Sequence, residues 1–188
     1  MEINEVLERL KEGNKRFVAD QLEHKLQDQE RRTELVKGQA PWAIILSCAD
    51  SRVAPELAFD TGLGELFVVR VAGNVANTSS MASIEYAVAH LGTPVIVVMG
   101  HQSCGAVGAA LAGGDNGYNL NHLLAHITPA ISASGENADT NEVVKKNAHL
   151  NASELITRSA IIRDAVNDGK VKVVSAYYNL TNGAVDFL

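Results

Sequence analysis

The chain contains four short apolar runs, rich in valine and isoleucine, from residue 41 onward. Unbroken apolar runs, unlike alternating ones, are typical of strands that are buried on both faces of a parallel sheet. The pattern therefore predicts four strands, at residues 42–47, 66–71, 95–99 and 171–178. The turn-forming pair Asn182–Gly183 follows the last of them, which predicts that residues 184–188 return as an antiparallel edge strand.

Helical periodicity dominates the sequence before and between these runs. Residues 4–20 predict an amphipathic helix with Asn4 as its N-cap, and its apolar positions form one stripe: Val6, Leu7, Leu10 and Phe17. The polar stretch 21–37 is expected to be partly helical and to face solvent. Further helices are predicted at 79–90 and 106–112, a helical patch at about 120–131 within a loop, and one or two surface helices within 141–167.

Strands that alternate with helices are typical of a doubly wound α/β fold. We therefore expect an α/β protein with a mostly parallel four-stranded sheet flanked by helices, an antiparallel C-terminal edge strand and an N-terminal helical arm. We expect a single domain over 1–188, made of the arm (1–36), a core that carries the chemistry (39–112), a variable helical and loop region (113–168) and the C-terminal strands (169–188).

Composition narrows the class of function. Hydrophobic residues make up 46% of the 188 residues, as in ordinary globular proteins, and the net charge of −6 comes without a basic cluster, which argues against nucleic acid as a partner. The longest apolar runs fall far short of the ~18 residues of a membrane span. The acidic amino terminus does not resemble a signal peptide, so we expect a cytoplasmic protein. In that compartment the two cysteines are expected to be ligands or nucleophiles rather than a disulfide.

Reactive side chains follow two of the predicted strands directly. Cys48, Asp50 and Arg52 come after the first strand, and His101 and Cys104 come after the third. Ligands of open α/β sheets bind outside the carboxyl ends of the strands, so these groups can meet in space. Two cysteines and one histidine form a ligand set that Zn²⁺ uses in catalytic sites, with a fourth position left for water.

Zinc lowers the pKa of a bound water to about 7, which suits attack of hydroxide on a small electrophile such as carbon dioxide. Asp50 and Arg52, two residues apart, are expected to form an ion pair that lets the carboxylate orient the zinc-bound hydroxide. The residues leave a second arrangement open, in which Asp50 itself takes the fourth position and closes the site.

Two longer motifs resemble the β-class carbonic anhydrases. The first is Cys48-Ala49-Asp50-Ser51-Arg52-Val53 followed by residues 64–70, and the second comprises residues 83–88 and 100–106. The resemblance runs from about residue 39 to 110 and again over 177–188. It implies the reversible hydration of carbon dioxide to bicarbonate by zinc-bound hydroxide, with one zinc ion per chain.

The resemblance also implies a role for each matching residue. The zinc ligands are Cys48, His101 and Cys104, and the catalytic pair is Asp50 and Arg52. Gln39 matches a glutamine that hydrogen-bonds the substrate. Phe67 and Tyr86 match pocket aromatics that the partner subunit contributes, since family members are dimers or larger assemblies of dimers. We therefore expect a homodimer or a tetramer, in which the first helix packs on the partner or on its own domain.

One departure bears on the state of the site. Family members that close their site with the aspartate carry a tryptophan three residues before the first ligand cysteine, and here that position is Ile45. We therefore expect the open form, with water as the fourth ligand. Other functions remain as alternatives: hydrolysis of CS₂ or COS on the same scaffold, a non-catalytic protein that zinc stabilises, and a hydrolase with a cysteine nucleophile.

Overall fold

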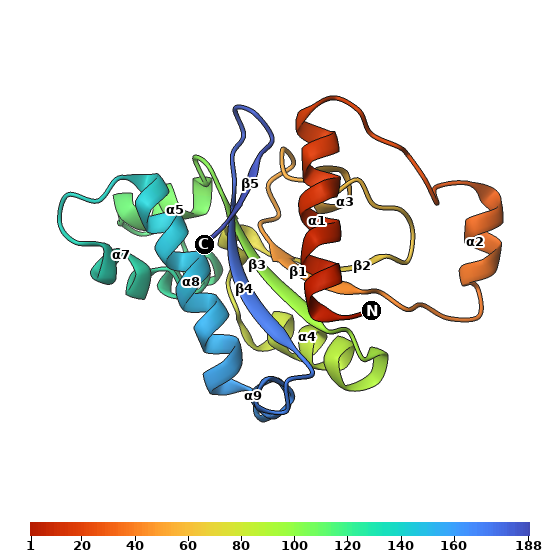
Figure 1. The fold of residues 1–188 in the computed structure, drawn as a ribbon. Coiled ribbons are helices and arrows are strands. Elements are labelled where there is room, and N and C mark those ends of the chain that lie inside the picture. Colours follow the sequence, from red (N-terminus) through yellow and green to blue (C-terminus); the bar gives the residue numbers. More distant parts are fainter.

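A computed structural model describes the whole chain, residues 1–188, around a five-stranded sheet in the order β2-β1-β3-β4-β5 (Figure 1). Strands β1 (Ala43–Ser47), β2 (Leu66–Arg70), β3 (Val95–His101) and β4 (Lys172–Tyr178) pair in parallel. Strand β5 (Val185–Phe187) pairs antiparallel with β4 at the edge. The predicted α/β class, its four parallel strands and the antiparallel edge strand are confirmed.

Alternate residues of the central strands face two different layers of helices. Ile45 and Val97 belong to one core, against α1 (Ile3–Val18). Ile44 and Ile96 belong to a second core, against α4 (Thr78–Leu91), α8 (Thr140–Arg158) and α9 (Ala160–Asn167). Both faces of β1 and β3 are therefore covered, which explains why these strands read as unbroken apolar runs.

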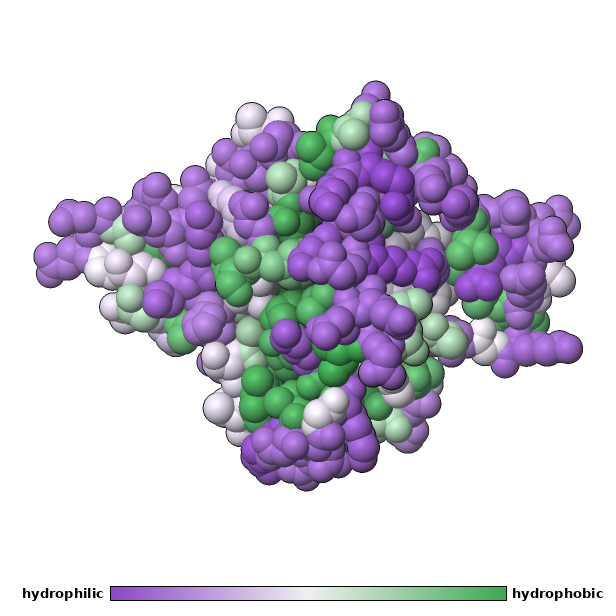
Figure 2. All heavy atoms as spheres, in the orientation of Figure 1, coloured by the Kyte–Doolittle hydropathy of each residue, from purple (hydrophilic) through white to green (hydrophobic).

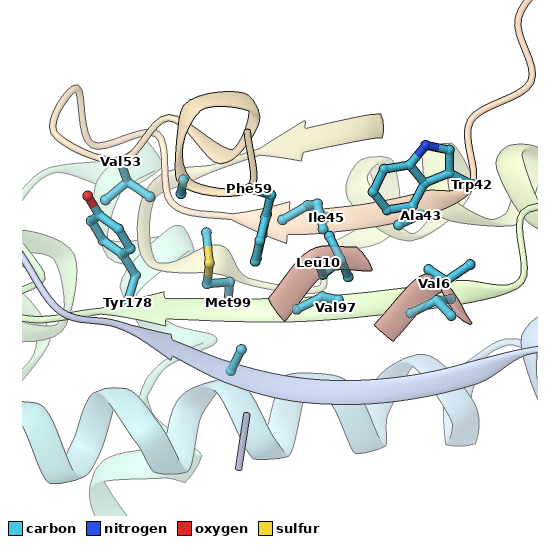
Figure 3. Packing of buried hydrophobic residues seen from close by; sticks show 13 residues of the cluster. Val6, Leu10, Trp42, Ala43, Ile45, Val53, Phe59, Val97, Met99 and Tyr178 are labelled. Atoms are coloured by element: carbon cyan, nitrogen blue, oxygen red, sulfur yellow. The ribbon is translucent and has the colours of Figure 1, made fainter. Parts of the chain in front are cut away.

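Helix α1 packs on the sheet of its own chain, which is one of the two placements that its apolar stripe allowed. Val6 and Leu10 are fully buried against β1 and β3, beside Phe59 (Figure 3). The predicted N-cap at Asn4 is wrong. The helix begins at Ile3 with Glu2 as N-cap, because Glu2 and Glu5 form a reciprocal capping box.

Two helices, α8 and α9, lie within 141–167 as predicted, but α8 is not only a surface helix, because one side of it packs against β3 and β4. Figure 1 shows it on the opposite side of the sheet from α1. Asparagine and alanine make up much of its buried side, which masked the amphipathic pattern in the sequence. Its buried residues are Val143, Val144, Asn147, Ala148, Asn151, Ala152 and Leu155.

The other helices are short. Helix α2 (Gln29–Leu35) has no buried residue and stands at one side of the molecule, as expected for the polar stretch (Figure 1). The predicted helix after β3 is α5 (Gly105–Ala112), and the predicted helical patch is split into α6 (Tyr118–Ala125) and α7 (Thr128–Ser134). Two elements were not predicted from the sequence: α3 (Pro55–Ala58) and a 3₁₀ turn, η1 (Ala72–Asn74).

The surface in the view of Figure 1 is mostly polar. Figure 2 shows a band of apolar side chains between α1 and α8, where β4 lies. Val173 and Val174 of β4 are accordingly only half-buried. None of the helices combines the length and the apolar character needed to cross a membrane.

Acid is expected to weaken the attachment of α1 through one buried ion pair. The Asp60 side chain is 3% exposed and accepts a hydrogen bond of 2.5 Å from Arg16 Nε. Burial raises the pKa of Asp60, but Arg16 and the Glu23 N–H outweigh it, so the pKa lies below its ordinary value. A lowered carboxyl pKa gives stability that is present above the unfolded-state pKa of about 3.9 and is lost as the pH falls through the folded-state pKa.

Asp60→Asn is therefore expected to lower the free energy of unfolding by about 1–2 kcal/mol at pH 7, and this difference from the parent should shrink below pH ~4. Asparagine suits the position because Asp60 has a φ of 47°. Urea unfolding at several pH values measures the difference. A difference that is the same at pH 3 and pH 7 would contradict the assignment.

Candidate metal centre

Three metal-binding side chains meet at the carboxyl end of the sheet. Cys48 follows β1, His101 is the last residue of β3, and Cys104 is the N-cap of α5. Strands β1 and β3 are parallel neighbours, with Ser47 opposite Met99, so the segments that follow them emerge side by side. All three side chains are buried and their ligand atoms lie within 4.8 Å of one another. The predicted ligand trio is therefore brought together.

The His101 ring is held in an orientation that leaves one nitrogen available. The side chain is completely buried, and Nδ1–H donates to the Gln102 carbonyl at 2.9 Å. This bond places the proton on Nδ1 and leaves the lone pair on Nε2. Nε2 is buried and has no hydrogen-bond partner. A buried unpaired nitrogen is costly, so its position beside two sulfurs indicates a site for a cation.

The thiols of Cys48 and Cys104 shift each other's pKa in opposite directions. A hydrogen bond from Cys104 lowers the pKa of Cys48, and the His101 ring and the Gly73 N–H add to this effect against burial. The neighbouring Cys48 and burial raise the pKa of Cys104. A bound divalent ion would stabilise both thiolates at once. The donor set therefore fits a soft divalent metal.

Asp50 and Arg52 form the predicted ion pair beside this cluster. Arg52 donates to Asp50 Oδ1 from Nε at 2.9 Å and from its backbone N–H at 2.9 Å, and to Oδ2 from Nη2 at 2.7 Å. These bonds to Arg52, the largest influence, hold the pKa of Asp50 well below its usual range. Asp50 Oδ2 lies 3.8 Å from His101 Nε2. The carboxylate is therefore ionised and lies next to the three candidate ligand side chains.

Arg70 is a site residue to which the sequence assigned no role. Its guanidinium donates to the Cys48 carbonyl at 3.0 Å and to the Asp50 carbonyl at 2.6 Å. It thereby holds the backbone of the turn that carries both a ligand and the carboxylate. The residue lies within the first motif, but hydrogen bonds to backbone atoms leave no signal in a sequence pattern.

The remaining predicted residues lie away from the cluster within one chain. Gln39 is exposed and precedes β1, whereas Cys48 follows it, and a five-residue strand spans about 15 Å. Phe67 pairs with Ile44 near the start of β1, and its ring centroid lies 6.4 Å from that of Tyr86. A surface hollow of about 440 Å³ beside the start of β2, lined by Gly62, Leu63, Gly64 and Leu66 among others, contains none of the ligands.

Comparison with known proteins gives consistent matches. A family model described as carbonic anhydrase matches residues 43–185. The chain is 41% identical over 180 residues to carbonic anhydrase 2 of Mycobacterium tuberculosis, covering 93% of this chain and 87% of the relative. It is 42% identical over 184 residues to a carbonic anhydrase of Mycolicibacterium smegmatis, covering 94% and 89%. A tetrameric β-carbonic anhydrase of Sordaria macrospora superimposes with a TM-score of 0.73 at 26% identity, covering 84% and 85%.

Proposed function

Because this chain belongs to the β class of the carbonic anhydrase family, we propose that it catalyses the reversible hydration of carbon dioxide to bicarbonate and a proton. Cys48, His101 and Cys104 would hold one zinc ion per chain beside the reacting molecules. The observation that carries the proposal is this buried trio, whose ligand atoms lie within 4.8 Å of one another while Nε2 of His101 has no hydrogen-bond partner.

Zinc bound there would act as a Lewis acid that lowers the pKa of water to about 7. The protein supplies the ligands in a form ready to bind. His101 Nδ1 is tied to a carbonyl, so that Nε2 keeps its lone pair. Cys104 lies at the amino end of α5, where the backbone N–H groups of Ala106 and Val107 partly oppose the rise in its pKa that Cys48 and burial cause. Three ligands leave the fourth position of a tetrahedral site for water.

Asp50 orients the attacking water. A carboxylate has about four acceptor sites. Arg52 occupies two of them on Oδ1 and one on Oδ2. The acceptor site that remains belongs to Oδ2, the oxygen that lies 3.8 Å from His101 Nε2. Asp50 accepts a hydrogen bond from the water there and directs an oxygen lone pair at the carbon of CO₂. The intact pair with Arg52 supports the open form of the site.

Self-association completes the substrate pocket. Strand β2 lies at the edge of the sheet with its apolar residues only half-buried, and Tyr86 is 49% exposed. These features leave an apolar surface near Gln39 that a second copy can cover. Gln39, Phe67 and Tyr86 of each protomer then line the site of its partner, where Gln39 binds a substrate oxygen. The related enzyme of Sordaria macrospora, described as tetrameric, supports such assembly.

The first test measures zinc content and CO₂ hydration on the purified protein. We expect about one zinc per chain, and hydration that chelators abolish and added zinc restores. If the protein contains zinc and hydrolyses CS₂ or COS but does not hydrate CO₂, the proposed substrate is wrong and one of these two compounds takes its place. Zinc with no activity on any of these would favour a structural role, and activity without metal would favour a cysteine nucleophile. A chain without zinc overturns the proposal.

Mixing two defective variants tests the shared pocket. Gln39→Ala removes the side chain that a protomer contributes to the site of its partner. Asp50→Asn inactivates the site of the protomer that carries the substitution. In a mixed dimer the site on the Gln39→Ala chain has its own Asp50 and receives Gln39 from the other chain. Co-expression of the two variants should therefore restore about a quarter of the parental activity, because half of the dimers are mixed and one site in each is intact. If the mixture is no more active than the two variants apart, each site belongs to one chain.

A further inference from the structure

We infer that the asparagines of α8 are positioning residues for the metal ligands, so that this helix sets the affinity of the site for zinc. The inference rests on the proposed zinc site and adds residues to which no role was assigned. Asn147 and Asn151 act on the side of Cys48, and Asn141 acts on the turn between His101 and Cys104. None of the three touches the ligand atoms themselves.

The first connection runs from Asn147 through Gly73 to Cys48. Asn147 Nδ2 donates to the Gly73 carbonyl at 2.8 Å, and the Gly73 N–H donates to Cys48 Sγ at 3.3 Å. Asn147 therefore holds the carbonyl of the residue whose own N–H, in the preceding peptide group, donates to the ligand sulfur. Its side chain is 1% exposed, so water does not replace this bond when it is lost.

Asn151 fixes Asn147 and the same loop one helical turn further along α8. Its Nδ2 donates to the Asn147 carbonyl at 2.8 Å and to Asn147 Oδ1 at 3.0 Å. Its Oδ1 accepts the Ala76 N–H at 2.6 Å. With its oxygen and its amide group both engaged, Asn147 has one orientation, in which Nδ2 meets Gly73. Two buried asparagines thus hold both ends of the segment from Gly73 to Ala76.

The second connection runs from Asn141 to the loop that carries His101 and Cys104. Asn141 Oδ1 accepts the Ser103 N–H at 2.9 Å. Ser103 has a φ of 54°, a left-handed conformation that is unfavourable for a residue with a side chain. The bond from Asn141 stabilises this conformation, which directs the flanking His101 and Cys104 toward one point.

Close packing makes both connections stiff. A methyl group at Gly100, which directly precedes His101, would lie 2.7 Å from Val144 Cγ1 and 3.2 Å from the Val144 carbonyl. A methyl group at Gly73, which has a φ of 71°, would lie 2.8 Å from Ile127 Cδ1. Val144 of α8 can therefore pack against the end of β3 because Gly100 lacks a side chain, and Ile127 packs against Gly73 for the same reason. The ligands are held in place before metal binds, which favours affinity.

Asn147→Leu tests the first connection. Leucine keeps the branched shape of asparagine, although it is bulkier, and it cannot donate to Gly73. We expect the zinc dissociation constant, measured by competition with a chelator, to rise about 10–100-fold. The Co²⁺-loaded variant should show altered near-ultraviolet absorption, which reports the cobalt–thiolate bonds. The matched control is Asn14→Leu, because Asn14 is likewise buried and its Nδ2 donates to the carbonyls of Ala58 and Gly183, which lie outside the metal site.

Asn14→Leu should lower thermal stability and leave the zinc dissociation constant within about twofold of the parent. A second pair of variants keeps the test decisive if Asn147→Leu does not fold. Asn141→Ala loses the acceptor for Ser103 and should weaken zinc binding, whereas Asn141→Asp keeps an acceptor oxygen and should bind zinc as the parent does.

The inference is overturned by any of three results: unchanged zinc affinity and cobalt spectrum in a folded Asn147→Leu, an equal loss of affinity in Asn14→Leu, or equal affinities of Asn141→Ala and Asn141→Asp. These results differ from failure of the proposed function. If the parent protein binds no zinc, the site itself is wrong. If the parent binds zinc and the α8 variants bind it equally well, only the role of α8 is wrong.

Discussion

Cys48→Ser is expected to remove zinc and CO₂ hydration together, with activity falling at least about 1,000-fold. The serine hydroxyl stays protonated at neutral pH and does not replace an anionic sulfur as a zinc ligand. Two donors from His101 and Cys104 then remain, too few for a stable tetrahedral site. Metal analysis of the purified variant, together with stopped-flow hydration measured by a pH indicator, reports both losses.

Ala49→Ser is the matched control, because it introduces the same hydroxyl one residue further along at an exposed position. It should keep both zinc and activity. Wild-type zinc content and activity in Cys48→Ser would show that this cysteine is not a ligand, and the proposed site would then be wrong.

Asp50→Asn is expected to lower kcat/KM for CO₂ about 100–1,000-fold while zinc stays bound. The variant has the same shape, but its amide nitrogen cannot accept a hydrogen bond. The amide oxygen is expected at the Oδ1 position, which accepts two hydrogen bonds from Arg52, so the NH₂ group takes the Oδ2 position, where Arg52 Nη2 and the cluster both lose an acceptor. Stopped-flow kinetics and metal analysis on the same sample separate the two effects.

Asp60→Asn provides the comparison, since it removes another aspartate that is paired with arginine, in a part of the fold where the pair holds α1. That variant should lose stability and keep the parental kcat/KM. If Asp50→Asn loses its zinc, the carboxylate serves to assemble the site. If it keeps both zinc and full activity, Asp50 does not orient the water.

The elements at the metal centre could be predicted because their signals are local. The five strands lie within one or two residues of their expected ends, since β1 and β3 are buried on both faces and must be apolar throughout. The turn at Asn182–Gly183 places β5. The ligand trio followed from the same reasoning, because side chains at the carboxyl ends of adjacent parallel strands must lie close together.

The buried side of α8 could not be predicted from local sequence signals. Its inner face carries Asn147 and Asn151, and hydropathy alone assigns such residues to the surface. They are buried because the loop after β2 presents Gly73 and Ala76 to them, a partner 74 and 75 residues away in the chain. The prediction of Asn4 as the N-cap of α1 was wrong for a related reason. Reciprocal hydrogen bonds between Glu2 and Glu5 set the start of the helix, although asparagine is the preferred cap residue.

The sequence by itself determined the α/β class, the order of the strands along the chain and the family, and it predicted which three side chains come together at the carboxyl end of the sheet. These depend on residue type and on spacing between neighbours. Only the tertiary structure decided which carbonyls Arg70 holds, that α8 bonds the Gly73 carbonyl and the Ser103 N–H, and that Gln39 lies beyond the other end of β1 from Cys48. Such contacts join segments far apart in the chain through backbone atoms, which every residue possesses, and a sequence pattern therefore does not reveal them.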